Sequence, residues 1–191
     1  MRSDEATRYR RFAARLNYLA MDRSDLQYAA KECCKHMASP KVGDWERIKR
    51  VGRYLRGRPR CVQIFRWENA SSKLEGYADS DWAGDKKTRK STSGGAVFLG
   101  KAMVKSWCSS QNVIALSSGE AELYALTKCA CQVTGLQSMA MDFGLHPQGR
   151  VYTDSSAAMV LQAEAGSEVR RGTFRYSTCG SKRKSKVAIW I

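Results

Sequence analysis

The first third of the chain has apolar residues at helical spacing. They recur every three or four positions at Phe12, Leu16, Leu19 and Ala20, then at Leu26, Ala29 and Ala30, and again at Trp45, Ile48, Val51 and Leu55. This spacing places apolar side chains on one face of a helix. Ser39-Pro40 interrupts the pattern, because the residue before a proline avoids the helical region of the backbone. The pattern therefore predicts two or three helices between residues 5 and 55.

The pattern changes to short alternating runs after a basic linker at residues 56–60. Runs of this kind, separated by Gly, Asn, Asp and Ser clusters, predict strands and turns. The predicted strands are residues 62–67, 74–78, 96–99, 104–108 and 151–153, and the predicted turns are 69–72, 85–95 and 100. The linker is the predicted domain boundary.

A long helix is predicted between the last two of these strands. Ser117-Ser118-Gly119-Glu120 has the spacing of a capping box, in which Glu120 reaches back to the amide of Ser117. Gly144 predicts the end of this helix, and residues 155–161 predict a second helix. One stripe of the long helix faces the sheet and consists of Leu126, Cys129, Val133, Leu136 and Ala140, with Glu122 at its head. Together these elements predict an α/β fold with a mixed sheet.

Composition limits the class of protein. The chain has 191 residues, of which 43% are apolar and 27% charged, as expected for a globular protein. No apolar run is long enough to span a bilayer, and the charged start predicts no secretory signal, so we expect an intracellular protein of the cytoplasm or nucleus with no membrane partner. The seven cysteines include no Cys-x-x-Cys pair and the two histidines lie far apart, so zinc is not expected.

Positive charge is concentrated at both ends of the chain. There are 33 Lys and Arg against 18 Asp and Glu, a net charge of +15. Residues 1–67 contain 17 basic and 7 acidic side chains, residues 68–167 contain 9 and 10, and residues 168–191 contain 7 and 1. Basic flanks around a near-neutral middle are typical of a protein that binds a polyanion. Solvated basic side chains on helix faces explain the same counts, and the charge alone does not separate the two interpretations.

Three acidic residues end or begin predicted elements. Asp79 and Asp154 follow strands, and Glu122 lies in the first turn of the long helix. Strand ends and helix starts meet at one edge of an α/β layer, so the three carboxylates can converge there. Clustered carboxylates without thiolates or imidazoles favour Mg²⁺. Taken one by one, the same residues are also explained as turn or helix-cap acids.

Several motifs around these acids resemble the ribonuclease H domain of copia-type retrotransposon Pol polyproteins. The motifs are residues 76–85 (GYADSDWAGD), 89–95 (RKSTSGG) and 115–125 (ALSSGEAELYA). Residues 5–58, which include Leu16-Asn17-Tyr18-Leu19 and Arg53-Tyr54-Leu55-Arg56-Gly57, resemble the helical end of the reverse transcriptase of the same polyprotein. The resemblance thus covers about 165 residues in order and divides the chain into a helical remnant (1–58), a ribonuclease H-like domain (59–170) and a basic tail (171–191).

The resemblance implies a function and a set of site residues. It implies a five-stranded mixed sheet with flanking helices and hydrolysis of the RNA strand of an RNA/DNA hybrid. Asp79, Glu122 and Asp154 match the metal ligands of the family, which implies two Mg²⁺ ions, with Mn²⁺ as an alternative. Small hydroxyl residues beside the acids are candidates for ribose contacts or for turn and cap roles: Ser80, Ser117, Ser118 and Ser155. A basic loop is a candidate for phosphate contacts through Lys86, Lys87, Arg89 and Lys90.

The chain departs from the family pattern in two places. The polymerase palm with its paired aspartates is missing, so we expect no reverse transcriptase activity from what was once part of a larger polyprotein. From about Arg171 the sequence does not resemble the family's last strand, and we expect that this strand and the acid that supplies a fourth ligand are missing. A frameshift in the tail would explain this difference. The nucleotide sequence tests that hypothesis. A sheet without its last strand would have an unpaired edge. The alternative function is therefore a catalytically inactive remnant that binds nucleic acid.

Overall fold

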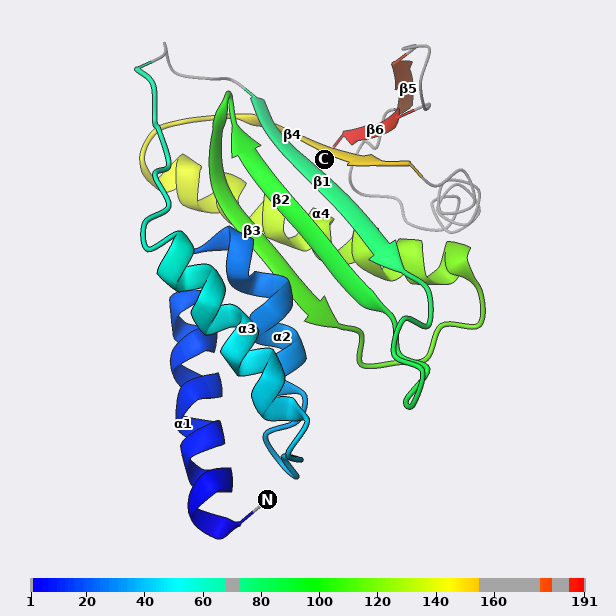
Figure 1. Cartoon of the computed structure of the whole chain (residues 1–191). Coiled ribbons are helices and arrows are strands. Elements are labelled where there is room, and N and C mark those ends of the chain that lie inside the picture. Colours follow the sequence, from blue (N-terminus) through cyan, green and yellow to red (C-terminus); the bar gives the residue numbers. More distant parts are fainter. Residues whose placement is uncertain (1, 68–72, 155–175, 180–185, 191) are drawn as a thin grey trace. The chain divides into compact units, whose positions relative to one another are not determined.

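The computed structural model describes residues 2–67, 73–154, 176–179 and 186–190 (Figure 1). It divides into two compact units, Met1–Ile64 and Phe65–Ile191. The sequence places its domain boundaries at 58/59 and 170/171, and these remain predictions. The predicted helix at 155–161, the turn at 69–72 and Ser155 lie outside the described residues.

The first unit is helical. It contains α1 (Ser3–Leu19), a short 3₁₀ helix (Ser24–Leu26), α2 (Gln27–Cys34) and α3 (Asp44–Gly57). The helices on either side of Ser39-Pro40 end and begin near it, which confirms the predicted break.

The core of this unit differs in one detail from the predicted apolar face of α1. The buried α1 side chains are Tyr9, Ala13 and Leu16, whereas Phe12 is 42% exposed. Tyr9 determines this orientation, because its hydroxyl donates a 2.8 Å hydrogen bond to the carbonyl of Cys33 in α2. The core-facing stripe of α1 is therefore rotated from the predicted one by part of a turn, and Phe12 lies at its margin.

The second unit contains a mixed sheet with one long helix on one face (Figure 1). The strands are β1 (Lys73–Asp81), β2 (Thr92–Leu99), β3 (Ala102–Ser110), β4 (Gln148–Thr153), β5 (Tyr176–Cys179) and β6 (Lys186–Trp190), and the helix is α4 (Ser118–Asp142). The strand order is β3-β2-β1-β4-β6-β5. Strands β1 and β4 are parallel and all other neighbours are antiparallel. The α/β class and the mixed sheet agree with the sequence prediction.

Packing of α4 against the sheet follows the predicted stripe. Leu126, Cys129 and Val133 are buried, and Leu136 packs against the same cluster. The sheet contributes Leu74, Ala78, Val97 and Val151. Full burial of each Val or Leu side chain contributes about 1.5–3 kcal/mol, so this stripe fixes the helix on the sheet. Gly144, with φ of +75°, ends the helix as predicted.

Two strand predictions are wrong. Residues 62–67 form no strand: Val62 is 78% and Trp67 98% exposed, and no described strand pairs with this segment. The alternating pattern is present, but within the described residues it pairs with no strand and its large apolar side chains stay exposed. The tail, in contrast, does form strands. β6 pairs antiparallel with β4, so the edge expected to be unpaired is covered.

Candidate metal centre

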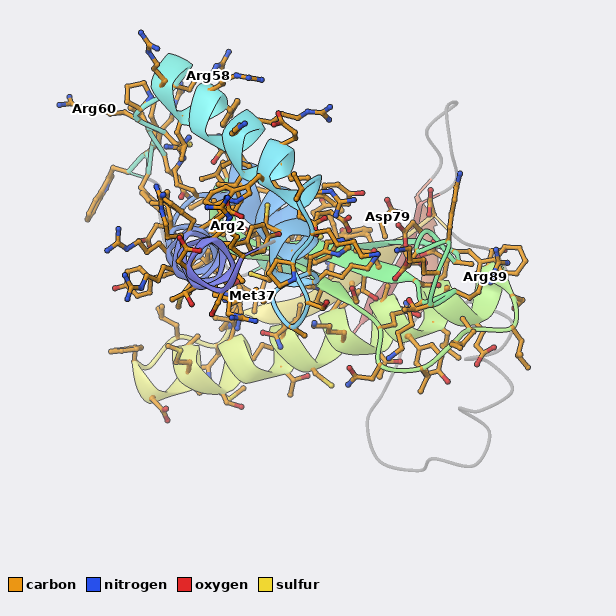
Figure 2. All side chains as sticks on the ribbon, turned by 60° about the horizontal axis from the view of Figure 1, so that its bottom comes forward. Arg2, Met37, Arg58, Arg60, Asp79 and Arg89 are labelled. Atoms are coloured by element: carbon orange, nitrogen blue, oxygen red, sulfur yellow. The ribbon has the colours of Figure 1, made fainter. Side chains whose placement is uncertain are left out.

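Three carboxylates converge at one end of the sheet. Asp79, Glu122 and Asp154 each offer an oxygen, and these oxygens lie within 4.8 Å of one another. Figure 1 shows why: the carboxyl ends of β1 and β4 and the start of α4 lie at the same end of the sheet. Figure 2 labels Asp79 at this end, with Arg89 in the loop that follows β1.

The register of β1 and β4 brings two of the acids together. Tyr77 pairs with Tyr152 at the end of the parallel ladder, and their rings stack 5.0 Å apart between centroids. Asp79 and Asp154 each lie two residues further along their strand, and side chains two residues apart share a face. Both are exposed. Parallel pairing therefore places these two acids side by side, although 75 residues separate them in the sequence.

The start of α4 fixes the third acid. Ser117 is the N-cap, and its hydroxyl accepts a 3.1 Å hydrogen bond from the amide of Glu120. The Glu120 carboxylate accepts from the amide of Leu116 at 2.7 Å, one residue before the predicted donor. The hydroxyl of Tyr124 donates to the other oxygen of Glu120 at 3.1 Å. Glu120 thus stabilises the helix start, which leaves Glu122 to face the strand ends.

Glu122 is held by one oxygen and unpartnered at the other. Its Oε1 accepts hydrogen bonds from the Ser80 amide at 3.2 Å and from the Ser80 hydroxyl at 2.9 Å. Its Oε2 is buried and has no hydrogen-bond partner among the described residues. Burial raises the pKa of Glu122, and the charges of Asp79 and Asp154 raise it further, against the lowering effect of Ser80. A buried carboxylate oxygen without a donor is costly unless a cation or proton joins it.

This donor set fits a hard divalent cation. All the converging ligands are carboxylate oxygens, which Mg²⁺ prefers, and the unpartnered Oε2 gives the cation a free ligand. No His or Cys belongs to this cluster within the described residues. The acidic triad can therefore hold a metal ion, with solvent completing the coordination on the exposed side.

The predicted hydroxyl residues differ in what they contact. Ser80 donates to Glu122, and Ser117 caps α4. Ser118 is exposed and makes no side-chain hydrogen bond with a described residue. Ser80 thus supports the acidic triad, and Ser118 has an exposed side chain that is open to a ligand among the described residues.

The basic loop after β1 is tightly structured at its base. The amide of Ala83 donates to the buried hydroxyl of Ser91 at 3.0 Å, and the Trp82 indole donates to the carbonyl of Ala115 at 3.1 Å. Asp85 accepts from the amide of Lys87 at 3.0 Å. The predicted phosphate-contacting side chains project from this base: Lys86, Lys87 and Arg89 are exposed, and Lys90 is half-buried.

One residue that supports the site was not predicted. Gln111, buried just after β3, donates from Nε2 to the hydroxyl of Ser93 at 2.9 Å and to the carbonyl of Ala121 at 2.8 Å. It joins strand β2 to the helix residue that precedes Glu122. A polar residue three positions after a predicted strand was the only sequence signal, and it is also typical of an ordinary turn.

Sequence relatives define the class of protein. The chain is 35% identical over 163 residues to a retrovirus-related Pol polyprotein from transposon RE2 of Arabidopsis thaliana, a match that covers 83% of the chain and 11% of the relative. It is 33% identical over 126 residues to an uncharacterised mitochondrial protein of A. thaliana, covering 66% of the chain and 52% of that protein. These relatives include a retrotransposon Pol polyprotein of the copia type.

A further match covers most of a relative. A Plasmopara viticola protein named secreted RxLR effector protein 161 is 34% identical over 121 residues, which cover 62% of the chain and 82% of that protein. The chain is similar to retrotransposon Pol polyproteins over most of its own length. It spans about a tenth of the length of the Pol polyproteins that it matches. No protein-family profile and no solved structure matches the chain.

No helix in the described part of the chain has the length and apolar character that crossing a membrane requires.

Proposed function

We propose that residues 59–170 are a retrotransposon-derived ribonuclease H domain that hydrolyses the RNA strand of RNA/DNA hybrids. One observation carries the proposal: Asp79, Glu122 and Asp154 converge within 4.8 Å, with a buried Glu122 oxygen left unpartnered. The copia-type Pol relatives supply the expected context, and the α/β fold with a mixed sheet is compatible with it. Residues 1–58 are, in this proposal, the end of the reverse transcriptase.

The residues of the chain have separate roles in this reaction. Asp79, Glu122 and Asp154 would hold Mg²⁺, or Mn²⁺ in its place. Ser80 donates two hydrogen bonds to Oε1 of Glu122 and thereby fixes the orientation of a carboxylate that would bind the metal. When bound, the divalent metal activates a water and neutralises charge that develops on the phosphodiester.

The substrate contacts follow from what is exposed near the triad. The basic loop after β1 lies at the same end of the sheet as the triad. Its positively charged side chains would contact backbone phosphates: Lys86, Lys87, Arg89 and Lys90. Ser118, an exposed residue at the start of α4, would contact a ribose 2′-hydroxyl, the group that distinguishes RNA from DNA. An RNA/DNA hybrid presents both backbone phosphates and ribose 2′-hydroxyls.

The test is cleavage of an end-labelled RNA/DNA hybrid in Mg²⁺ by the whole chain. We expect cleavage of the RNA strand, little cleavage of a DNA duplex, and a loss of at least about a hundredfold in Asp79→Asn. Asp142→Asn, which removes an exposed carboxylate at the far end of α4, is the matched control and should retain full activity. Cleavage by Asp79→Asn at the normal rate would refute the site.

A second function is favoured by a different observation. The cluster contains three acids within the described residues, one fewer than the family pattern implies, while the net charge is +15. We therefore propose as the alternative a catalytically inactive remnant that binds nucleic acid. It predicts no cleavage in Mg²⁺ or Mn²⁺, together with hybrid binding that weakens as salt is raised.

A further inference from the structure

A hollow of about 190 Å³ lies on the surface of α1. It is lined by Arg8, Arg11, Phe12 and Arg15, all of them exposed. Residues three and four positions apart are neighbours on a helix surface, so Arg8, Arg11 and Arg15 form one continuous row. Phe12 lines the same hollow.

These three arginines have no partner in the described part of the chain. None of them makes an ion pair or a side-chain hydrogen bond there. Other arginines of the same unit are engaged: Arg10 donates to the carbonyl of Met37 at 2.9 Å, and Arg23 pairs with Asp25 at 2.7 Å. Like charges at this spacing destabilise a helix. An anion bound across the row would remove that cost.

Phe12 lines the hollow, and its ring packs against another aromatic side chain of the same unit. It contacts Trp45 edge-on, with ring centroids 5.9 Å apart, and stays 42% exposed. The apolar stripe of α1, formed by Tyr9, Ala13 and Leu16, is buried in the core of the unit. That stripe cannot enter a lipid surface while the unit is folded, which argues against a membrane as the partner.

Size and charge together indicate a polymer of phosphates. Small-molecule pockets usually have volumes of about 300–1,000 Å³, and this hollow is smaller. It suits one phosphate group of a longer chain. Guanidinium groups bind phosphate through paired hydrogen bonds. Residues 1–64 contain 16 basic and 7 acidic side chains, so the surrounding field also attracts a polyanion. Figure 2 shows more basic side chains on this unit, including Arg58 and Arg60 beyond the end of α3.

We propose that Arg8, Arg11 and Arg15 form a binding site for the phosphodiester backbone of a nucleic acid, with Phe12 beneath the sugar or base. The site shares a partner with the proposed function but requires neither the carboxylates nor a metal. Binding can therefore be measured in the absence of cleavage.

The experiment compares two variants of the whole chain that lose the same charge. One is R8Q/R11Q/R15Q, and the control is R50Q/R53Q/R56Q, which removes three exposed arginines from α3. Affinity for a fluorescently labelled RNA/DNA hybrid is measured by anisotropy in EDTA over a range of salt concentrations. Circular dichroism checks that both variants are folded.

We expect the first variant to lose affinity by about tenfold or more and the control by less than about threefold. The slope of log affinity against log salt should become less negative by roughly 0.7–0.9 in the first variant, because the hollow suits one phosphate group and each phosphate contact contributes about that amount. Equal losses in both variants would overturn the site, since they indicate general charge attraction. Undiminished hybrid binding by the first variant would overturn it as well, and so would equally tight binding of poly-glutamate, which indicates an acidic protein partner. An inactive enzyme leaves these outcomes unchanged, so failure of the proposed function is distinguished from failure of this site.

Discussion

Ser80 donates two hydrogen bonds to the same oxygen of Glu122, one from its amide at 3.2 Å and one from its hydroxyl at 2.9 Å, across 42 residues of sequence. The pair joins the end of β1 to the first turn of α4. Because both donors meet Oε1, the carboxylate has one defined orientation, and Oε2 remains buried and unpartnered in the described structure. The orientation of one carboxylate of the acidic triad thus depends on the residue that directly follows another member, Asp79.

Removal of the Ser80 hydroxyl should weaken metal binding. In Ser80→Ala the carboxylate of Glu122 keeps only the backbone donor, and loss of such a supporting hydrogen bond typically lowers metal affinity by about 10–100-fold. We expect about tenfold weaker Mg²⁺ or Mn²⁺ binding by isothermal titration calorimetry. Ser118→Ala alters an exposed serine on α4, the helix that contains Glu122. It is the control and should bind the metal as the parent chain does. Equal affinity in Ser80→Ala would contradict the supporting role.

Glu122→Gln should stabilise the metal-free protein and abolish its response to metal. The substitution removes a negative charge that is partly buried beside Asp79 and Asp154, the arrangement that raises the Glu122 pKa. In EDTA we expect Tm to rise by roughly 2–4 °C, which corresponds to about 1 kcal/mol for a protein of this size. Added Mg²⁺ should raise Tm of the parent chain but not of the variant. Scanning fluorimetry with and without Mg²⁺ measures both effects, and a variant that still responds to Mg²⁺ would exclude Glu122 as a ligand.

The helical unit should lose stability in acid through Asp25. Two hydrogen bonds from Arg23 and one from Tyr54 lower the pKa of Asp25 from 3.8 to about 2. A carboxyl whose pKa is lower in the folded chain stabilises the fold above pH 3.8, and this contribution is lost as the pH falls towards 2. Asp25→Asn should therefore have a lower Tm than the parent chain at pH 7, and the difference should vanish near pH 2. Asp22→Asn, an exposed neighbour, should show no such pH-dependent difference.

Gly76→Ala should destabilise the sheet unit. A Cβ at this position would lie 2.6 Å from the Cys129 sulphur and 2.7 Å from a methyl of Val133. Overpacking of this kind costs about 1–3 kcal/mol, which chemical denaturation detects as a lower midpoint. Gly94→Ala on the adjacent strand is the matched control, because its added Cβ would lie 4.0 Å from the carbonyl oxygen of Trp107, an ordinary van der Waals distance. A midpoint for Gly76→Ala equal to that of the control would mean that α4 can move away from β1 at little cost.

The parts of the fold that local pattern controls were predictable from the sequence. The long helix of the second unit was predicted at 117–143 and is found at 118–142, with Ser117 as its cap and Gly144 at its end. Burial along its stripe also follows the 3.6-residue period. The convergence of Asp79, Glu122 and Asp154 was predicted from the position of each at the end or start of an element.

The predictions that were wrong or missing concern residues whose structure depends on contacts with residues distant in the sequence. Residues 62–67 have the alternation of a strand but form no strand in the described structure, because strand pairing needs a neighbour that the local pattern does not reveal. Phe12 is apolar and correctly spaced, yet the hydrogen bond from Tyr9 to α2 orients α1 differently. Gln111 matters because Ser93 and Ala121 lie beside it, which no local pattern reveals.

The pairing of β6 with β4 has a consequence for how the gene can change. Strand addition is made by backbone amides and carbonyls, which every residue except proline supplies in full, and the segment Lys186–Trp190 contains no proline. The outer edge of this sheet therefore places few demands on the identity of the amino acids that complete it. A tail translated in a different reading frame can close the sheet as long as it contains one short segment that favours the extended conformation.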